Sequence, residues 1–329
     1  MAVGSGLAAQ IGIKKEAVYG TAVVVDKFYE FRTENFVLDK DYLQSTQLRS
    51  GRAYPSASRR TPTTRRATGS VTMEVPNKLF GSFLDLAHDN VVTPVQQGVT
   101  TAYLQTHNIA VGSSTKSATI QIGKPDSSGV VQPFTGVGSV LTNWTLDCDL
   151  GEFLTSQLTF DVRDLVNTEA LATAAYPAGL GGFNFSQGLI TIDGTPQTGV
   201  GVRGFTINGG QAFKADRFGL NRTGLKGRPI PNAYATGEGV LRMEFESMTH
   251  YNRFINNTRV AVILEFVGGL IASTYYETMK ITLSSVGWEG ATPVVDGPDV
   301  VDHEMQMRIL DNGTDPPIKI EYTSTDVTV

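Results

Sequence analysis

Hydrophobic and polar residues alternate with a period of two along most of the chain. Val71, Met73 and Val75 are separated by Thr72 and Glu74, and the residues from 144 to 150 repeat this pattern. The alternation recurs in the segments 158–162, 190–192, 241–245, 262–266, 305–309 and 318–322. A period of two is typical of strands with one buried face, and turn-forming Gly, Pro, Asn and Asp separate these segments. The pattern predicts a mainly β fold, an antiparallel sandwich or barrel.

One segment, 77–89, has the spacing of an α-helix. Asn77 is a suitable N-cap, and the leucines and phenylalanines that follow it fall on one broad apolar stripe. We expect this single flanking helix to lie across a sheet face. Weaker helical patterns cover 165–175 and 248–256.

The length of 329 residues allows one large core or two moderate ones. We expect a single domain over 1–329, with a two-lobed form as the alternative to one elongated body. The first lobe would cover 1–164, including an Arg-rich loop at 45–68 and the helix at 77–89. The second would cover 176–329.

Charge is sparse and slightly acidic. Charged residues make up 18% of the chain, against a usual fraction of about 25%, which suggests that some surface is covered by a partner. The net charge of −5 argues against a protein that binds nucleic acid by neutralising its phosphates. We expect that DNA close to this protein moves past it without being bound.

Two stretches break the even distribution of charge. Residues 42–73 contain six arginines and no acid among Ser, Thr, Pro and Gly, which predicts a long mobile loop over 45–68. Residues 289–315 contain seven acids and only Arg308 as a cation. The Arg-rich loop has three interpretations: a solvated loop without a partner, a DNA-binding arm, or an assembly loop that docks onto the acidic stretch of a neighbouring subunit.

We favour the assembly loop, and its candidate contacts are ten charged residues. They are Arg49, Arg52, Arg59, Arg60, Arg65, Arg66, Asp296, Asp299, Asp302 and Glu304.

Signatures of catalysis or cofactor binding are absent from the sequence. The motif GVGVRG at 199–204 has dinucleotide-binding letters, but a strand-like segment follows it where a helix is needed. The four histidines lack metal-ligand spacing and are expected at the surface or at helix ends, and the acids near 300 predict a solvated loop rather than a cation site. Cys148 is the only cysteine, and its place on an apolar strand face predicts a buried thiol. We therefore expect no catalytic residue, no cofactor, no metal and no enzymatic activity.

The sequence also predicts no membrane span and no secretory signal. The N-terminus lacks a basic region followed by an apolar core. The longest apolar stretch, 260–272, is interrupted by Glu265 and two glycines and is shorter than the roughly 20 residues that span a bilayer. Together with the single cysteine, this favours synthesis in the cytoplasm.

The N-terminal phrase AQIGIKKEAVYGT at 9–21 is followed by the aromatic strand FYEF at 28–31. A long loop, the strand GSVTMEV at 69–75, the helix and a second set of alternating strands come next. This phrase and this order resemble the tail tube (major tail) proteins of long-tailed, siphovirus-type bacteriophages. The resemblance extends over nearly the whole chain.

The resemblance implies a structural virion protein with a β-sandwich, one flanking helix and long inter-subunit loops. Its subunits would join into hexameric rings that stack into the tail tube, the conduit for DNA ejection, after assembly in the host bacterial cytoplasm. The implied partners are further copies of the chain, the tape-measure protein, and the tail terminator and distal tail proteins. Viral double-stranded DNA would pass through without specific binding.

Two other functions remain open at the level of sequence. The first is the inner tube of a contractile tail or injection system, which has a similar fold. The second is a β-sandwich binding module for host-surface carbohydrate, in which Trp144, Trp288 and exposed tyrosines would stack on sugar rings.

Overall fold

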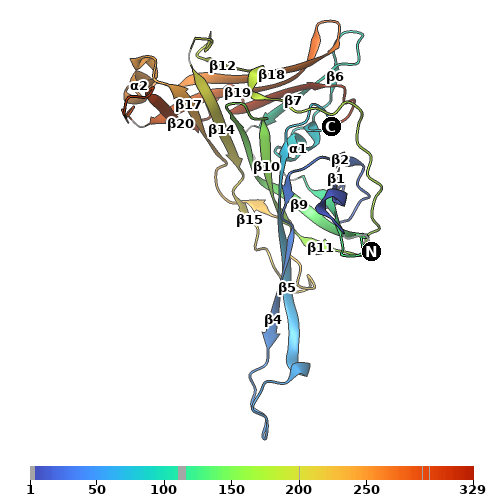
Figure 1. The fold of residues 1–329 in the computed structure, drawn as a ribbon. Helices are drawn as coiled ribbons and strands as arrows, with labels where there is room; N and C mark the ends of the chain where they lie inside the picture. Colours follow the sequence, from blue (N-terminus) through green and yellow to red (C-terminus); the bar gives the residue numbers. More distant parts are fainter. Residues whose placement is uncertain (1–3, 110–115, 200, 291, 296) are drawn as a thin grey trace.

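A computed structural model describes residues 4–109, 116–199, 201–290, 292–295 and 297–329. The protein is mainly antiparallel β, as the sequence predicts, and a long two-stranded hairpin projects from one end of the body (Figure 1). Three short 3-10 helices, Gly6–Ala8, Ala57–Arg59 and Phe185–Gln187, lie between the strands.

A five-stranded sheet lies beside the N-terminus. Its strands follow the order β2 (Lys27–Tyr29), β1 (Gln10–Lys15), β8 (Ala118–Pro125), β9 (Val131–Asp149) and β11 (Asp164–Val166). Strand β9 is 19 residues long, and only its first half belongs to this sheet. Its second half continues into the larger sheet and joins the two.

The larger sheet forms two layers. In the first layer β9 lies between β10 (Thr155–Val162) and β14 (Val202–Gly210). β10 pairs with β5 (Arg60–Glu74), which also pairs with β3 (Thr33–Glu34) and β4 (Val37–Gln44). On the other side β14 pairs with β17 (Thr236–Glu244), and β17 pairs with β20 (Asp302–Ile309).

Strand β19 (Tyr275–Gly290) carries the sheet into the second layer. It pairs with β20 near its C-terminal end and with β21 (Ile318–Ser324) further back. β18 (Val260–Ala272), β12 (Gly188–Ile192) and β13 (Thr195–Pro196) extend the layer on one side, and β7 (Tyr103–Ile109) and β6 (Val95–Gln96) on the other. A separate pair is formed by β15 (Phe213–Lys214) and β16 (Ile230–Pro231).

The core lies between these layers and follows the alternation of the sequence. Trp144, Leu146 and Cys148 are buried, and the ring of Phe205 on β14 lies 5.9 Å from that of Phe266 on β18. Gly209 is required opposite Trp144, because a Cβ atom there would lie 2.2 Å from the indole ring. The packing of aromatic rings across the layers makes the fold a β-sandwich.

Helix α1 (Gly81–Leu86) is shorter than the predicted segment 77–89. Leu79 adopts a φ of 68°, which no continuous α-helix allows, so the helix begins only after it. α1 still covers a sheet face as expected, since the ring of Phe83 lies 4.6 Å from that of Tyr29 and 6.5 Å from that of Phe160. Helix α2 (Met248–Ile255) confirms the second helical pattern, with Ser247 as its N-cap.

The helix predicted over 165–175 is wrong. Leu165 and Val166 continue the pairing with β9, and no regular structure follows them. The side chain of Gln121 supplies the hydrogen bonds that a helix would otherwise make, donating to the carbonyl of Ala170 and accepting from the amide of Ala172. The backbone is thereby satisfied in an extended form.

The two expected lobes share strand pairs in this fold. β7 of the first pairs with β21 of the second, and β9 pairs with β14. One cluster of buried apolar side chains runs through both. A division at 164–176 remains a prediction.

Candidate inter-subunit surfaces

The most unusual feature is the projecting hairpin, here called the arm and defined as residues 37–66. All eight side chains of β4 are exposed, although Val37, Leu38 and Leu43 are apolar. The arm carries the turn residues 45–59 at its tip, far from the body (Figure 1). An isolated two-stranded hairpin is marginally stable in water, so the arm depends on contacts beyond its own strand pair.

The expectation of a mobile loop over 45–68 is therefore wrong for its second half. Residues 60–68 form part of β5 and pair with β4, placing Arg66 opposite Asp39 and Arg65 opposite Lys40. The Arg66 guanidinium lies 2.6 Å from the Asp39 carboxylate. Asp39 precedes residue 42, so the observation that residues 42–73 contain no acidic residue does not include it.

The six predicted arginines fall into three groups. Arg65 and Arg66 are engaged within the chain, with Arg65 lying 2.7 Å from Asp164. Arg59 donates to Gln47, and Arg60 lies 4.5 Å from the centre of the Tyr42 ring. The side chains of the last two arginines have no hydrogen bond or ion pair within the part of the chain that the structure describes, and both lie at the tip: Arg49 and Arg52.

Of the predicted acids, Asp299, Asp302 and Glu304 lie in or near β20, at the opposite end of the molecule from the arm's tip (Figure 1). Asp302 lies 3.3 Å from Arg203, and Asp299 accepts a hydrogen bond from the amide of Val300. Glu304 is exposed on β20. Asp296 lies outside the described residues. The structure thus separates the arginines and the acids along the long axis rather than pairing them within one subunit.

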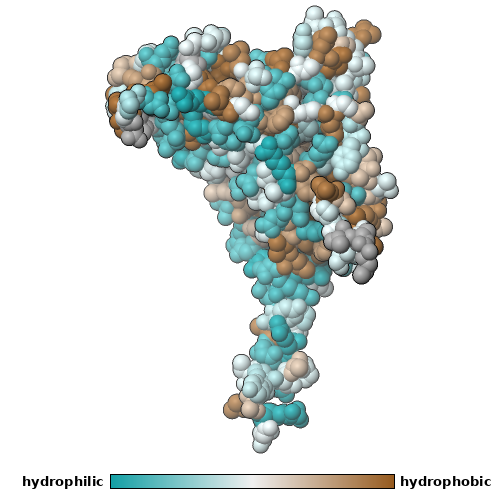
Figure 2. Space-filling view, in the orientation of Figure 1, coloured by the Kyte–Doolittle hydropathy of each residue, from teal (hydrophilic) through white to brown (hydrophobic). Residues whose placement is uncertain are grey.

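The arm also exposes apolar side chains at its tip. Leu48 is fully exposed, and Tyr54 retains 87% of its accessible surface. The space-filling view shows hydrophobic colour among the polar residues at the end of the arm (Figure 2). Exposed apolar residues on a long strand edge are an aggregation hazard unless a partner covers them.

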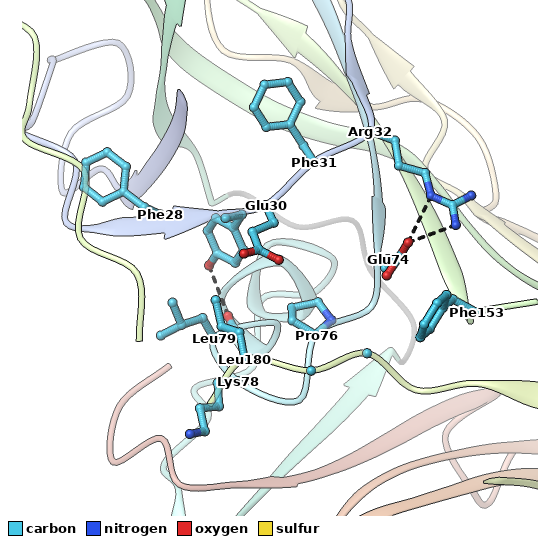
Figure 3. Close-up of a pocket in the computed structure, with 13 residues that line it drawn as sticks. Phe28, Glu30, Phe31, Arg32, Glu74, Pro76, Lys78, Leu79, Phe153 and Leu180 are labelled. Carbon is cyan, nitrogen blue, oxygen red and sulfur yellow. Dashed lines mark hydrogen bonds and ion pairs between the residues drawn. The ribbon is translucent and has the colours of Figure 1, made fainter. Parts of the chain in front are cut away.

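A groove of about 430 Å³ opens at the side of the body, between β2, the end of β5 and the segment around Leu180 (Figure 3). Phe31 and Phe153 contribute apolar side chains to the lining, and Arg32 lies 3.0 Å from Glu74 beside them (Figure 3). The lining contains no thiol and no histidine, and its charged side chains are those of Glu30, Arg32, Glu74 and Lys78.

All four histidines are buried, so the expectation of surface histidines is wrong, whereas His88, just after α1, and His250, in the first turn of α2, lie at helix ends as predicted. His88 follows α1 and His107 lies on β7, and the fold brings Nε2 of His88 to 3.1 Å from Nδ1 of His107. Burial lowers the pKa of His88 to about 4 and that of His107 to about 3. No group of three or more His, Cys, Asp or Glu side chains among the described residues could hold a metal ion.

Other sequence features have structural roles. Burial raises the pKa of Cys148 to about 11, which leaves its thiol protonated and unreactive. Val202 begins strand β14, so the glycine motif leads into a strand, as predicted. Trp144 and Trp288 are each only 6% exposed, so neither can stack on a sugar ring. No helix in the described ranges is long and apolar enough to cross a membrane.

A β-sandwich with a projecting, charged and partly apolar arm is the form of a structural protein that assembles with other subunits. Comparison of the sequence with protein families agrees with this class: a family described as phage tail tube protein matches residues 6–321. The chain therefore belongs to the phage tail tube protein family and is a structural component of the virion. None of the curated proteins compared with it matches.

Proposed function

We propose that this protein forms hexameric rings that stack into the tail tube of a phage and conduct its DNA during ejection. The observation that carries the proposal is the arm: a regular hairpin, exposed on both faces, that extends beyond the body along the long axis (Figure 1). A segment of this form binds the next subunit and has no function in an isolated monomer.

Ring closure is supported by open sheet edges. In the described part of the chain β4 pairs only with β5, and β6 only with β7. Each leaves a row of backbone groups for a strand of a neighbouring copy. A head-to-tail interface between two such edges closes into a ring when the rotation between subunits fits.

Stacking is supported by the opposite charges of the two ends. Arg49, Arg52, Arg59 and Arg60 are free of carboxylate partners within the described chain, so the arm binds carboxylates of the next copy, whose near end is the one that carries Asp299 and Glu304. Arg65 and Arg66 already bind acids of their own subunit, so they support the arm from within. Charge-assisted contacts of this type set the register between rings and favour the correct partner.

The remaining partners are those of the tail. The tape-measure protein would fill the tube during assembly, the terminator and distal tail proteins would close its ends, and subunits would assemble in the host cytoplasm. The net charge of −5 suits a conduit, because a surface without excess cations does not retain phosphate. An inner tube of a contractile tail would have the same surfaces, and retention of a sheath protein in a pull-down would favour it.

The proposal is tested by purifying the full chain and following light scattering together with negative-stain electron microscopy. Wild-type protein should form rings and hollow filaments. The variant with Arg49, Arg52, Arg59 and Arg60 all replaced by Glu should form rings that do not stack. Replacement of the same four residues by Gln is the matched control and should stack weakly. Normal filaments from the glutamate variant would refute the docking function of the arm.

A further inference from the structure

A second basic segment lies at the root of the arm, and sequence reasoning did not single it out. Residues 214–228, here called the root loop, connect β15 to β16 and contain five cations and the single acid Asp216. The cations are Lys214, Arg217, Arg222, Lys226 and Arg228.

The root loop is fastened to the base of the arm. The amide of Arg65 on β5 donates a 2.9 Å hydrogen bond to the carbonyl of Gly224. Gly224 has a φ of 77°, and a Cβ atom there would lie 2.1 Å from the carbonyl oxygen of Thr63. The loop therefore follows β5 so closely that only glycine fits at the contact (Figure 1).

A buried ion pair secures the same loop to the body. Lys226 is only 2% exposed and binds the carboxylate of Asp161 on β10. Because a buried ammonium without its partner is strongly unfavourable, this pair fixes the path of the loop. The root loop is consequently a preorganised surface, which loses little conformational entropy when it binds.

The other cations of the root loop have no carboxylate partner in the described chain. Arg217 donates to the carbonyl of Arg228, and Arg222 donates to the carbonyl of Arg217. The guanidinium of Arg228 lies over the ring of Tyr19, 5.5 Å from its centre, and that of Arg163 lies over the same ring at 5.7 Å. Arg217, Arg222 and Arg228 are thus held in place by backbone oxygens and one aromatic face, and Lys214 is exposed.

The root loop lies beside the base of the arm, and the arginines of the tip lie at its far end. The two basic surfaces are therefore at different heights along the long axis (Figure 1). When two copies are placed in line, the body of one meets the acidic end of the next at the level of the root, while the tip reaches further along the second copy. On this basis, and building on the stacking proposed above, we infer that the root loop is the surface that receives the acidic end of the next copy, through Lys214, Arg222 and the carboxylates of Asp299 and Glu304.

The test reverses the two exposed cations of the loop, Lys214→Glu and Arg222→Glu, in the full chain. The concentration at which filaments form should rise at least about tenfold, because a weak surface ion pair is lost in every subunit of a ring at once. The increase should shrink at high salt. Far-UV circular dichroism and the mass of isolated rings verify that the variant folds.

A second variant adds Asp299→Lys and Glu304→Lys to the reversed loop. Recovery of filaments at a concentration close to that of the wild type would support the assignment of both surfaces. If adding Asp299→Lys and Glu304→Lys does not restore filament formation to the variant with the reversed loop, the assignment is overturned. If the glutamate variant does not fold, Lys214→Gln with Arg222→Gln replaces it, and filaments at the wild-type concentration would again overturn the inference.

These outcomes separate the inference from the proposed function. Wild-type protein that forms neither rings nor filaments would contradict the tube assembly itself. Wild-type filaments together with unchanged assembly of the Lys214→Glu/Arg222→Glu variant would leave the tube intact and remove only the root loop from the interface.

Discussion

Strand β5 belongs to both the body and the arm, and its two halves are built differently. From Ala67 onward every second side chain is buried, and the backbone pairs with β10 on one side and with β3 and β4 on the other. From Arg60 to Arg66 the side chains are exposed or half-buried. Within the described chain only β4 pairs with this half as a strand, and the Arg65 amide bonds the root loop at Gly224.

The difference separates folding from assembly within one strand. The body half is stabilised by apolar area that the chain buries against itself. The arm half buries little within its own subunit, so under the proposed stacking its apolar side chains contribute free energy to assembly and little to folding. Changes in the body should therefore alter the free energy of unfolding, and changes in the arm should alter assembly alone. The predictions below follow this contrast, from the largest expected effect on unfolding to the smallest.

The largest effect is expected for Phe160→Ala in the body. Phe160 is 1% exposed, and its ring contacts those of Phe36 and Phe83. Loss of the ring leaves a cavity and should lower the free energy of unfolding by about 3–5 kcal/mol. Urea unfolding followed by tryptophan fluorescence measures the change, and a loss below about 1 kcal/mol would contradict the packing described here.

A similar but separable effect is expected at the junction of body and arm. Lys226→Met leaves the Asp161 carboxylate buried without its partner and should cost about 3 kcal/mol. Adding Asp161→Leu removes the stranded charge and should restore more than half of the loss. A double variant as unstable as the single one would show that the ion pair is not the source of the effect.

Acid should weaken the body through its buried histidines. His88 and His107 have folded pKa values of about 4 and about 3, below the ordinary value of 6.5. Below pH 6.5 the unfolded chain binds protons that the folded chain rejects, so stability present above that pH is lost as pH falls toward 4. Each histidine contributes a slope of up to about 1.4 kcal/mol per pH unit.

The variant His107→Gln provides the comparison for this slope. It should unfold with a shallower dependence on pH between 6.5 and 4, because one of the buried imidazoles no longer titrates. Burial also lowers the pKa of His250 to about 4, so part of the slope should remain. Identical slopes for the two proteins would show that His107 is not kept neutral by the fold.

The body was far easier to predict from the sequence than the arm. Alternation at Val71 and Met73 identifies a strand because one face is buried within the same chain. Residues 60–66 are a strand for a different reason, pairing with β4 and charge complementarity to Asp39, and such partners leave no periodic signal. The His88–His107 contact and the Gly224–Thr63 contact join distant segments, so only the fold reveals them.

The smallest effect on unfolding is expected at the tip of the arm. Replacing residues 45–59 by Asn-Gly would join Gln44 to Arg60 through a two-residue turn and remove the exposed Leu48 and Tyr54. Because no core side chain is lost and the loop becomes shorter, the free energy of unfolding should change by less than about 0.5 kcal/mol. Filament formation should nevertheless be abolished in light scattering and electron microscopy, because the proposed function assigns the tip to contact with the next copy. If the shortened arm lowers the free energy of unfolding, the tip contributes to the stability of the body, contrary to the prediction. If the shortened protein still forms filaments, the tip is not needed for stacking, and only the root of the arm remains as the stacking surface.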